Sequence, residues 1–216
     1  WLTTNTPSDF EPYSKIGMGL GYTNLSSEDI IKSGQLAELA GIKWIREEFS
    51  WGKIQPQSNK WVWNEYDNSV ESARRFHQNI LGLLDYWTGW SKPYTVDGYK
   101  QYAKFVFEVV NRYKDKVQHW EIWNEPNIFY WKGTPEQYVD LLKAAYRAAK
   151  DADPQCKIIA CTTAGVDTDF IEKVFKAGGL DYMDGISVHP YRDPYPDRNG
   201  LAEDLFKVHE LVKKYS

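Results

Sequence analysis

The chain has 216 residues, with 26 Lys or Arg against 30 Asp or Glu and a formal net charge of −4. This length suits one domain with a large buried core or two small ones. The weak negative charge provides no basic field for nucleic acid or anionic lipid, and no apolar run is long enough to cross a membrane. Aromatic residues make up 16% of the chain, a surplus that suits either a well-filled core or a cleft in which flat rings stack on sugars.

Two features of the sequence bear on the cellular compartment. Cys156 and Cys161 flank an apolar run expected to be a strand. Such a strand separates them by about 16 Å, too far for a disulfide. The chain starts at Trp1 without a basic or apolar leader. Either a signal peptide has been removed, which predicts a secreted or extracytoplasmic protein, or the numbering begins inside a longer chain, and a cytoplasmic location stays open.

Short apolar runs alternate with amphipathic stretches along the whole chain. In chain order, the expected elements are a strand at 16–20, a helix at 27–40, a strand at 43–46, a helix at 65–77, a strand at 80–84, a helix at 97–113, a strand at 117–123, a helix at 135–152, a strand at 157–162, a helix at 167–177, a strand at 185–189 and a helix at 201–215. No linker or low-complexity stretch divides these six β-α units. Residues 1–216 are therefore predicted to form a single domain.

Regular β-α alternation predicts an α/β fold with parallel strands and right-handed crossovers. The two candidate architectures are a doubly wound open sheet and a (β/α)₈ barrel. Gly17, Gly19 and Gly21 are followed by Tyr22, which breaks the glycine fingerprint of a dinucleotide site. At roughly 34 residues per unit, a complete barrel needs two units more than this chain provides. The prediction is an incomplete TIM-type barrel of about six β-α units.

The most specific stretch is residues 120–127, which read Trp-Glu-Ile-Trp-Asn-Glu-Pro-Asn. An apolar strand ends there in an amide and a carboxylate, and Pro126 is expected to stop the strand and to hold Glu125 extended. Carboxyl ends of barrel strands form active sites. Rings such as Trp123 and Trp131 would desolvate the carboxyl group, and desolvation favours the protonated form that a general acid needs. The alternative is an exposed loop carboxylate.

This stretch resembles the fourth-strand motif of clan A glycoside hydrolases, which are retaining (β/α)₈ enzymes. It is most similar to families 39 and 5, with their β-xylosidase, mannanase and endoglucanase members. Residues 44–51, Trp-Ile-Arg-Glu-Glu-Phe-Ser-Trp, running on to 54–56, resemble the arginine-bearing second strand of that clan. Residues 186–191, Ile-Ser-Val-His-Pro-Tyr, resemble its sixth strand end. The three matches occur in the order of the family.

The resemblance implies a role for each matching residue. Glu125 would be the general acid/base, and Asn124 would hydrogen-bond the sugar 2-hydroxyl. Arg46 would hold the carboxylate of the nucleophile ionised, because a neighbouring guanidinium favours the charged form. His189 and Tyr191 would line the −1 subsite.

Other roles follow from the residues themselves. Arg46 could instead pair with Glu121 or Glu47 inside the barrel. Aromatic residues just after predicted strands are candidate platforms for sugar rings. These candidate platforms are Trp51, Trp87, Trp90 and Trp131.

The predicted function is a retaining glycoside hydrolase that cleaves a β-linked polysaccharide or oligosaccharide. Retention needs two carboxyl groups about 5–5.5 Å apart, and the resemblance places the nucleophile, a Glu, on a seventh strand that this chain lacks. The alternative is an inactive carbohydrate-binding fragment, or one part of an assembly that a homodimer or a complementing C-terminal segment closes. Which glycan is bound, and whether action is endo or exo, stays open. No metal or phosphate motif occurs, so no cofactor and no metal are predicted.

Overall fold

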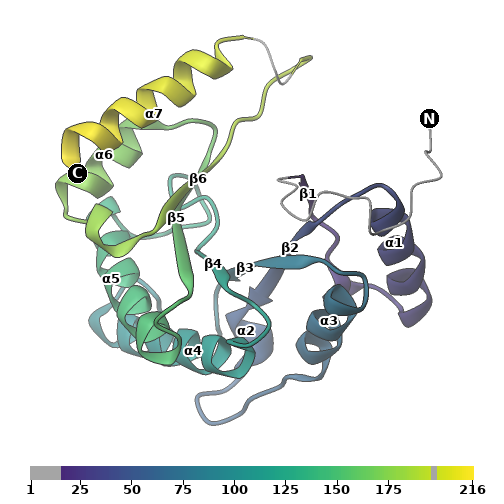
Figure 1. The fold of residues 1–216 in the computed structure, drawn as a ribbon. Helices are drawn as coiled ribbons and strands as arrows, with labels where there is room; N and C mark the ends of the chain where they lie inside the picture. The colour runs from purple at the N-terminus through teal and green to yellow at the C-terminus, as the bar shows by residue number, and fades with distance from the viewer. Residues whose placement is uncertain (1–15, 196–198) are drawn as a thin grey trace.

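The computed structural model describes residues 16–195 and 199–216. Six parallel strands form one sheet in the order β1 to β6. The strands are β1 (Gly17–Met18), β2 (Trp44–Ser50), β3 (Asn79–Asp85), β4 (His119–Ile122), β5 (Lys157–Ala164) and β6 (Gly185–His189). The sheet curves into part of a ring that is open between β1 and β6 (Figure 1). The predicted parallel β-α alternation is confirmed.

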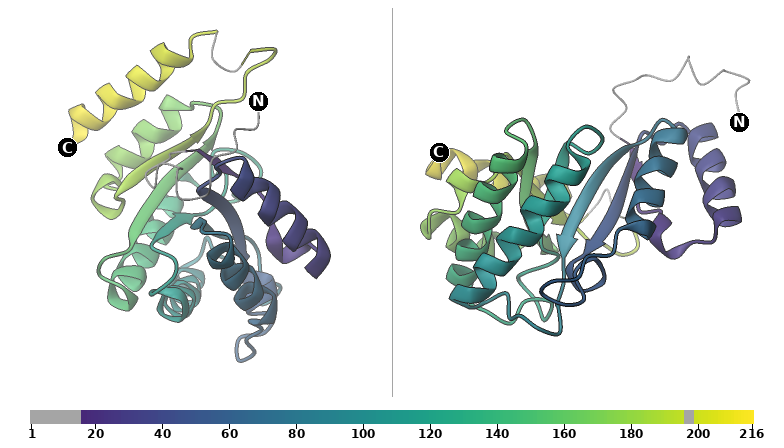
Figure 2. Two further views of the ribbon diagram at one scale, coloured as in Figure 1. Left: turned by 45° about the vertical axis from the view of Figure 1, so that its right-hand side comes forward. Right: turned by 90° about the horizontal axis from the view of Figure 1, so that it is seen from below.

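Helices follow the strands and lie outside the curved sheet (Figure 2). They are α1 (Ser27–Leu39), α2 (Trp51–Ile54), α3 (Asn64–Arg75), α4 (Val96–Tyr113), α5 (Pro135–Ala152), α6 (Thr168–Lys176) and α7 (Leu201–Tyr215), with two 3₁₀ turns, η2 (Tyr22–Asn24) and η3 (Leu180–Tyr182). Within the described ranges, none of the helices is long and apolar enough to span a membrane. Helix α2, which follows β2 without a loop, was not predicted from the sequence.

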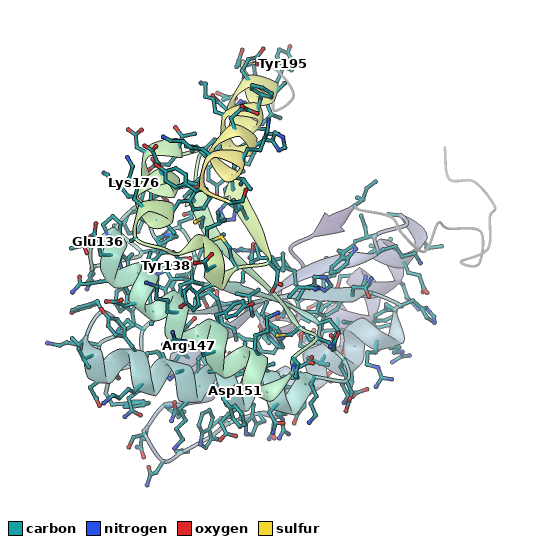
Figure 3. All side chains as sticks on the ribbon, turned by 60° about the vertical axis from the view of Figure 1, so that its left-hand side comes forward. Glu136, Tyr138, Arg147, Asp151, Lys176 and Tyr195 are labelled. Carbon is teal, nitrogen blue, oxygen red and sulfur yellow. The ribbon has the colours of Figure 1, made fainter. Side chains whose placement is uncertain are left out.

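Helix α5 shows how local sequence sets an element and its orientation. Thr134 caps the helix and makes a reciprocal capping box with Gln137, and a proline stands in its first turn. Tyr138 lies on the buried side of α5, whereas Glu136, Arg147 and Asp151 lie on the exposed side, as Figure 3 shows. Both predicted ends of this helix are confirmed.

The main core lies between the outer face of the sheet and the helices. The Trp120 ring packs edge-on against Phe49, with 5.1 Å between the ring centroids. It also lies across β3 at Gly82, where a Cβ atom would come within 2.5 Å of the ring. Glycine is therefore required at that position so that β4 can place its tryptophan against the sheet.

Strand β2 runs four residues beyond its predicted end, to Ser50. The charged residues in this segment made the extension hard to predict from the sequence, because charged residues are rare inside strands. Glu47 projects toward the helices and is fully buried. Its carboxylate accepts hydrogen bonds from the backbone N–H of Tyr22 (2.9 Å) and from the N–H and hydroxyl of Thr23 (3.0 and 2.8 Å). Arg46 projects to the opposite face, into the hollow of the ring.

Candidate active site

The backbone turns sharply where β4 ends, one residue earlier than predicted. Trp123 has a φ of 67° and Glu125 a φ of 46°. Non-glycine residues in this left-handed region each cost about 1–3 kcal/mol and need support from their surroundings. The Trp123 N–H donates to the carbonyl of Leu84 (3.0 Å), and the Glu125 N–H donates to that of Thr162 (2.8 Å). The prediction that Glu125 is extended is therefore wrong, since the turn donates hydrogen bonds to carbonyls on both neighbouring strands and Glu125 is held in the left-handed region by its bond to β5.

Two side chains tie this turn to β5. The Tyr138 hydroxyl donates to the carbonyl of Ile122 (3.0 Å) and accepts from the N–H of Cys161 (3.1 Å). The Asn127 amide donates to the carbonyl of Ala164 (3.0 Å) and accepts from its N–H (2.9 Å). Cys161 itself has a φ of 57° and lies where the pairing of β5 and β6 shifts in register. These hydrogen bonds therefore hold the ends of β4 and β5 together next to Glu125.

The Glu125 carboxylate meets two side chains from the end of β6. Its Oε1 lies 2.8 Å from Nδ1 of His189 and accepts a hydrogen bond of 2.8 Å from the Tyr191 hydroxyl. Tyr191 is 74% exposed, and mainly its hydrogen bond to Glu125 raises its pKa, which keeps that hydroxyl a donor. Within the described residues, no side chain bonds Oε2. One carboxylate oxygen is therefore held and the other stays free.

Arg46 reaches across the hollow to β4. Its Nε donates to Glu121 (2.5 Å), and its Nη2 donates to the side-chain oxygen of Asn124 (2.9 Å). Glu121 is 1% exposed, so the guanidinium compensates a buried carboxylate. Of the two alternative partners, the structure selects Glu121 and not Glu47, which lies on the other face of the sheet. The predicted contact with a nucleophile stays a prediction.

An open cleft lies between Arg46 and the end of β6. It has a volume of about 580 Å³ and is lined by Arg46 on β2 and by residues 188–192 at the end of β6. Glu125, Asn124, His189, Tyr191 and Arg46, chosen from the sequence, thus meet at the carboxyl ends of the strands. This is the edge where parallel barrels carry their chemistry.

The structure contradicts two of the four aromatic platforms. Trp51 is completely buried in α2, and its ring stacks on Phe105 with centroids 5.9 Å apart. Trp131 is 6% exposed, packs edge-on against Trp123 at 5.2 Å, and donates its indole N–H to the carbonyl of Thr134 (3.0 Å). Neither ring is exposed enough to serve as a platform, because Tyr102 and Phe105 of α4 pack against Trp51 and the rings of Trp123 and Tyr138 pack against Trp131.

Trp87 and Trp90 are only partly buried and line a hollow of about 530 Å³ in the loop after β3. The Lys132 ammonium lies 5.1 Å from the Trp87 ring centre. The indole N–H of Trp90 donates to the carbonyl of Gln55 (2.9 Å). Their role as platforms stays a prediction. In the described part of the chain, no cluster of three or more His, Cys, Asp or Glu could hold a metal ion.

Two residues at the end of β3, Asp85 and Tyr86, belong to this site although no sequence motif singles them out. The Tyr86 hydroxyl accepts from the side-chain amide of Asn124 (2.8 Å). Both carboxylate oxygens of Asp85 are buried without a hydrogen-bond partner among the described residues. Burial raises the pKa of Asp85 well above its usual range, and Glu48 and Glu121 add to this effect while Arg46 opposes it. The buried Asp85 carboxyl group therefore keeps its proton to a higher pH than an exposed aspartate does.

The substitution Asp85→Asn tests this burial through the pH dependence of stability. A carboxyl group whose pKa is higher in the folded than in the unfolded chain binds more protons when folded, so its contribution is lost as pH rises above the unfolded value of about 3.9. We expect Asp85→Asn to stabilise the chain relative to the unaltered one increasingly from about pH 4 upward, by on the order of 1–3 kcal/mol. Glu47, whose pKa burial also raises, is common to both chains.

Urea unfolding measured from pH 4 to pH 8 gives this difference directly. Asp115→Asn is the matched control, because Asp115 is exposed in the loop after α4. A difference between Asp85→Asn and the unaltered chain that is constant or shrinks with pH would contradict the prediction.

Comparison with known proteins agrees with this arrangement. The glycosyl hydrolase family 1 model matches residues 70–140. The aryl-phospho-beta-D-glucosidase BglH of Bacillus subtilis (strain 168) is 28% identical over 197 residues, which cover 74% of this chain and 40% of that protein. A beta-xylosidase of Caldicellulosiruptor saccharolyticus is 33% identical over 97 residues, covering 34% of this chain and 20% of that protein.

A solved family 39 glycoside hydrolase from Bacteroides cellulosilyticus WH2 superposes with a TM-score of 0.69 at 26% identity, covering 82% of this chain and 38% of that one. The chain therefore spans at most 40% of the length of these relatives. Together with the ordered strand-end residues, the matches place it in clan A of the glycoside hydrolases, and its open sheet is an incomplete (β/α)₈ barrel. Within the clan, the matches include families 1 and 39. The resemblance to family 5 stays a prediction.

Proposed function

We propose that this chain supplies the acid/base half of a retaining glycoside hydrolase that acts on β-linked polysaccharides or oligosaccharides. The observation that carries the proposal is the state of the Glu125 carboxylate. His189 and Tyr191 hold Oε1, and Oε2 has no partner among the described residues. Glu125 protonates the departing glycosidic oxygen through Oε2 and later takes a proton from the attacking water.

Neighbouring groups support this role. The Arg46 guanidinium orients Asn124 beside Glu125, where the amide can bind a sugar hydroxyl. His189 and Tyr191 line the cleft on its other side. The partly buried Trp87 and Trp90 line a separate hollow in the loop after β3, and we propose that they bind further sugar units there.

A second carboxylate must complete the reaction. On the inner face of the sheet, Glu121 is buried and paired with Arg46, and Asp85 is buried as well. Neither of these two carboxyl groups is free to attack a bound sugar, and the partly buried Glu48 on β2 does not match the nucleophile position of the resembled clan, a Glu at the end of a seventh strand. We propose that the nucleophile comes from a further β-α unit or from another chain that closes the ring between β1 and β6.

The second candidate function is carbohydrate binding without turnover. The hollow lined by Trp87 and Trp90 favours it, because aromatic rings can bind sugars without a second carboxylate. Calorimetry with xylo-, manno- and cello-oligosaccharides, run beside a reducing-sugar assay, separates the two functions. We expect the 216-residue chain to bind without turnover. A protein that joins it to a seventh strand should hydrolyse the bound sugar with retention, visible by NMR of the first-formed anomer. Inversion, or no activity with that addition, would refute the hydrolase proposal.

A further inference from the structure

Four side chains form a continuous chain of hydrogen bonds across the inner face of the sheet. Glu121 on β4 accepts from Arg46 on β2 (2.5 Å), and Arg46 donates to Asn124 (2.9 Å). Asn124 in turn donates from Nδ2 to the hydroxyl of Tyr86, which follows β3 (2.8 Å). Three neighbouring strands therefore share in placing a single amide group.

The donors and acceptors in this chain fix the direction of the amide. A guanidinium has only donors, so the group facing Arg46 must be the amide oxygen of Asn124. Turning the amide over would set its NH₂ group against the N–H groups of Arg46, with no acceptor between them. Of the two N–H bonds of Nδ2, one is given to Tyr86 and one is left.

Tyr86 is well placed to act as a fixed acceptor. Its ring packs against Tyr130, with centroids 5.5 Å apart, and edge-on against Trp123 at 6.2 Å. Burial raises the pKa of Tyr86, and the carboxyl groups of Asp85 and Glu48 raise it further. The hydroxyl therefore stays neutral at neutral pH, where its oxygen can accept from the amide.

We propose that Tyr86 is a positioning residue that holds the Asn124 amide with one N–H bond directed at the sugar. The inference rests on the proposed function, since it assigns the free N–H to the hydroxyl at C2 of the sugar beside Glu125. Arg46 determines which end of the amide faces the substrate. Tyr86 determines where that end lies, because it anchors the nitrogen from the opposite side.

The substitution Tyr86→Phe removes the hydroxyl and keeps the ring. Tyr130→Phe is the matched control, since no hydrogen bond of the Tyr130 hydroxyl is found within the described residues, and its ring lies next to that of Tyr86. In the ¹⁵N-labelled chain, we expect Tyr86→Phe to shift the side-chain N–H signals of Asn124 and to speed their exchange with water. Tyr130→Phe should leave both unchanged. Asn124→Ser identifies the signals by their loss.

Calorimetry with xylotriose, cellotriose and their 2-deoxy analogues gives the second readout. In Tyr86→Phe the Asn124 amide is no longer held against the 2-hydroxyl, and loss of that one neutral hydrogen bond should weaken the affinity for the parent sugar roughly 3- to 10-fold. The affinity for the 2-deoxy analogue, which lacks this hydroxyl, should change little. Equal weakening for both sugars would overturn the positioning role, because general damage does not distinguish the 2-hydroxyl. Unchanged Asn124 signals would overturn it independently of any sugar. If the unaltered chain binds neither sugar, the proposed function fails, while the NMR result still decides whether Tyr86 holds the amide.

Discussion

The substitution Glu125→Gln is expected to lower kcat for unactivated β-glycosides by about 10²–10⁴-fold in a protein that joins this chain to the second carboxylate. Glutamine keeps the shape of the side chain, and its amide oxygen can still accept from Tyr191 as Oε1 does. It has no proton to give to the glycosidic oxygen, however, so the alcohol must leave as an alkoxide. Steady-state kinetics on xylo- and cello-oligosaccharides measures the loss.

Substrates with a good leaving group separate this role from damage to the fold. A nitrophenolate leaves without protonation, so the glycosylation step of an aryl glycoside should be much less affected. Azide, which attacks without a base, should then restore turnover. Glu136→Gln is the control, because Glu136 is exposed on the outer side of α5 (Figure 3). An equal loss on both substrate types without rescue would contradict the acid/base role.

Trp51→Ala is expected to lower the free energy of unfolding by about 3–5 kcal/mol. The ring is completely buried, with Tyr102 and Phe105 at centroid distances of 5.4 and 5.9 Å. Its indole N–H also donates to the buried side chain of Gln55 (2.8 Å), which would lose this partner at a further cost of about 1–3 kcal/mol. Urea unfolding followed by circular dichroism measures the change.

Trp87→Ala is the informative comparison, since the Trp87 ring is only partly buried. We expect this variant to lose less stability and, if the ring is a platform, to bind oligosaccharides more weakly. The opposite result would be a Trp51→Ala variant with unchanged stability and weaker sugar binding. It would show that Trp51 is a sugar platform, as the sequence predicted, and that its ring is not part of the core.

The sequence alone determined most of the elements and the site residues at the ends of β4 and β6. The predicted bounds of α5, β6 and α7 agree with the structure because periods of 3.6 and 2 residues are local properties that a segment carries with it. Parallel strands joined by helices place their carboxyl ends at one edge. For this reason Glu125 and His189, 64 residues apart in the chain, could be assigned to one site from the sequence alone.

Only the tertiary structure decided which groups face each other and which are covered. Glu125 adopts a left-handed φ because a carbonyl on β5 accepts its N–H, and no neighbour in sequence predicts that bond. Tyr86 meets Asn124 across 38 residues because the register of β3 and β4 brings their ends together. Trp51 is buried and Trp87 is not, although both follow strands. Periodicity describes one segment at a time, whereas burial and hydrogen-bond partners depend on the segments packed against it.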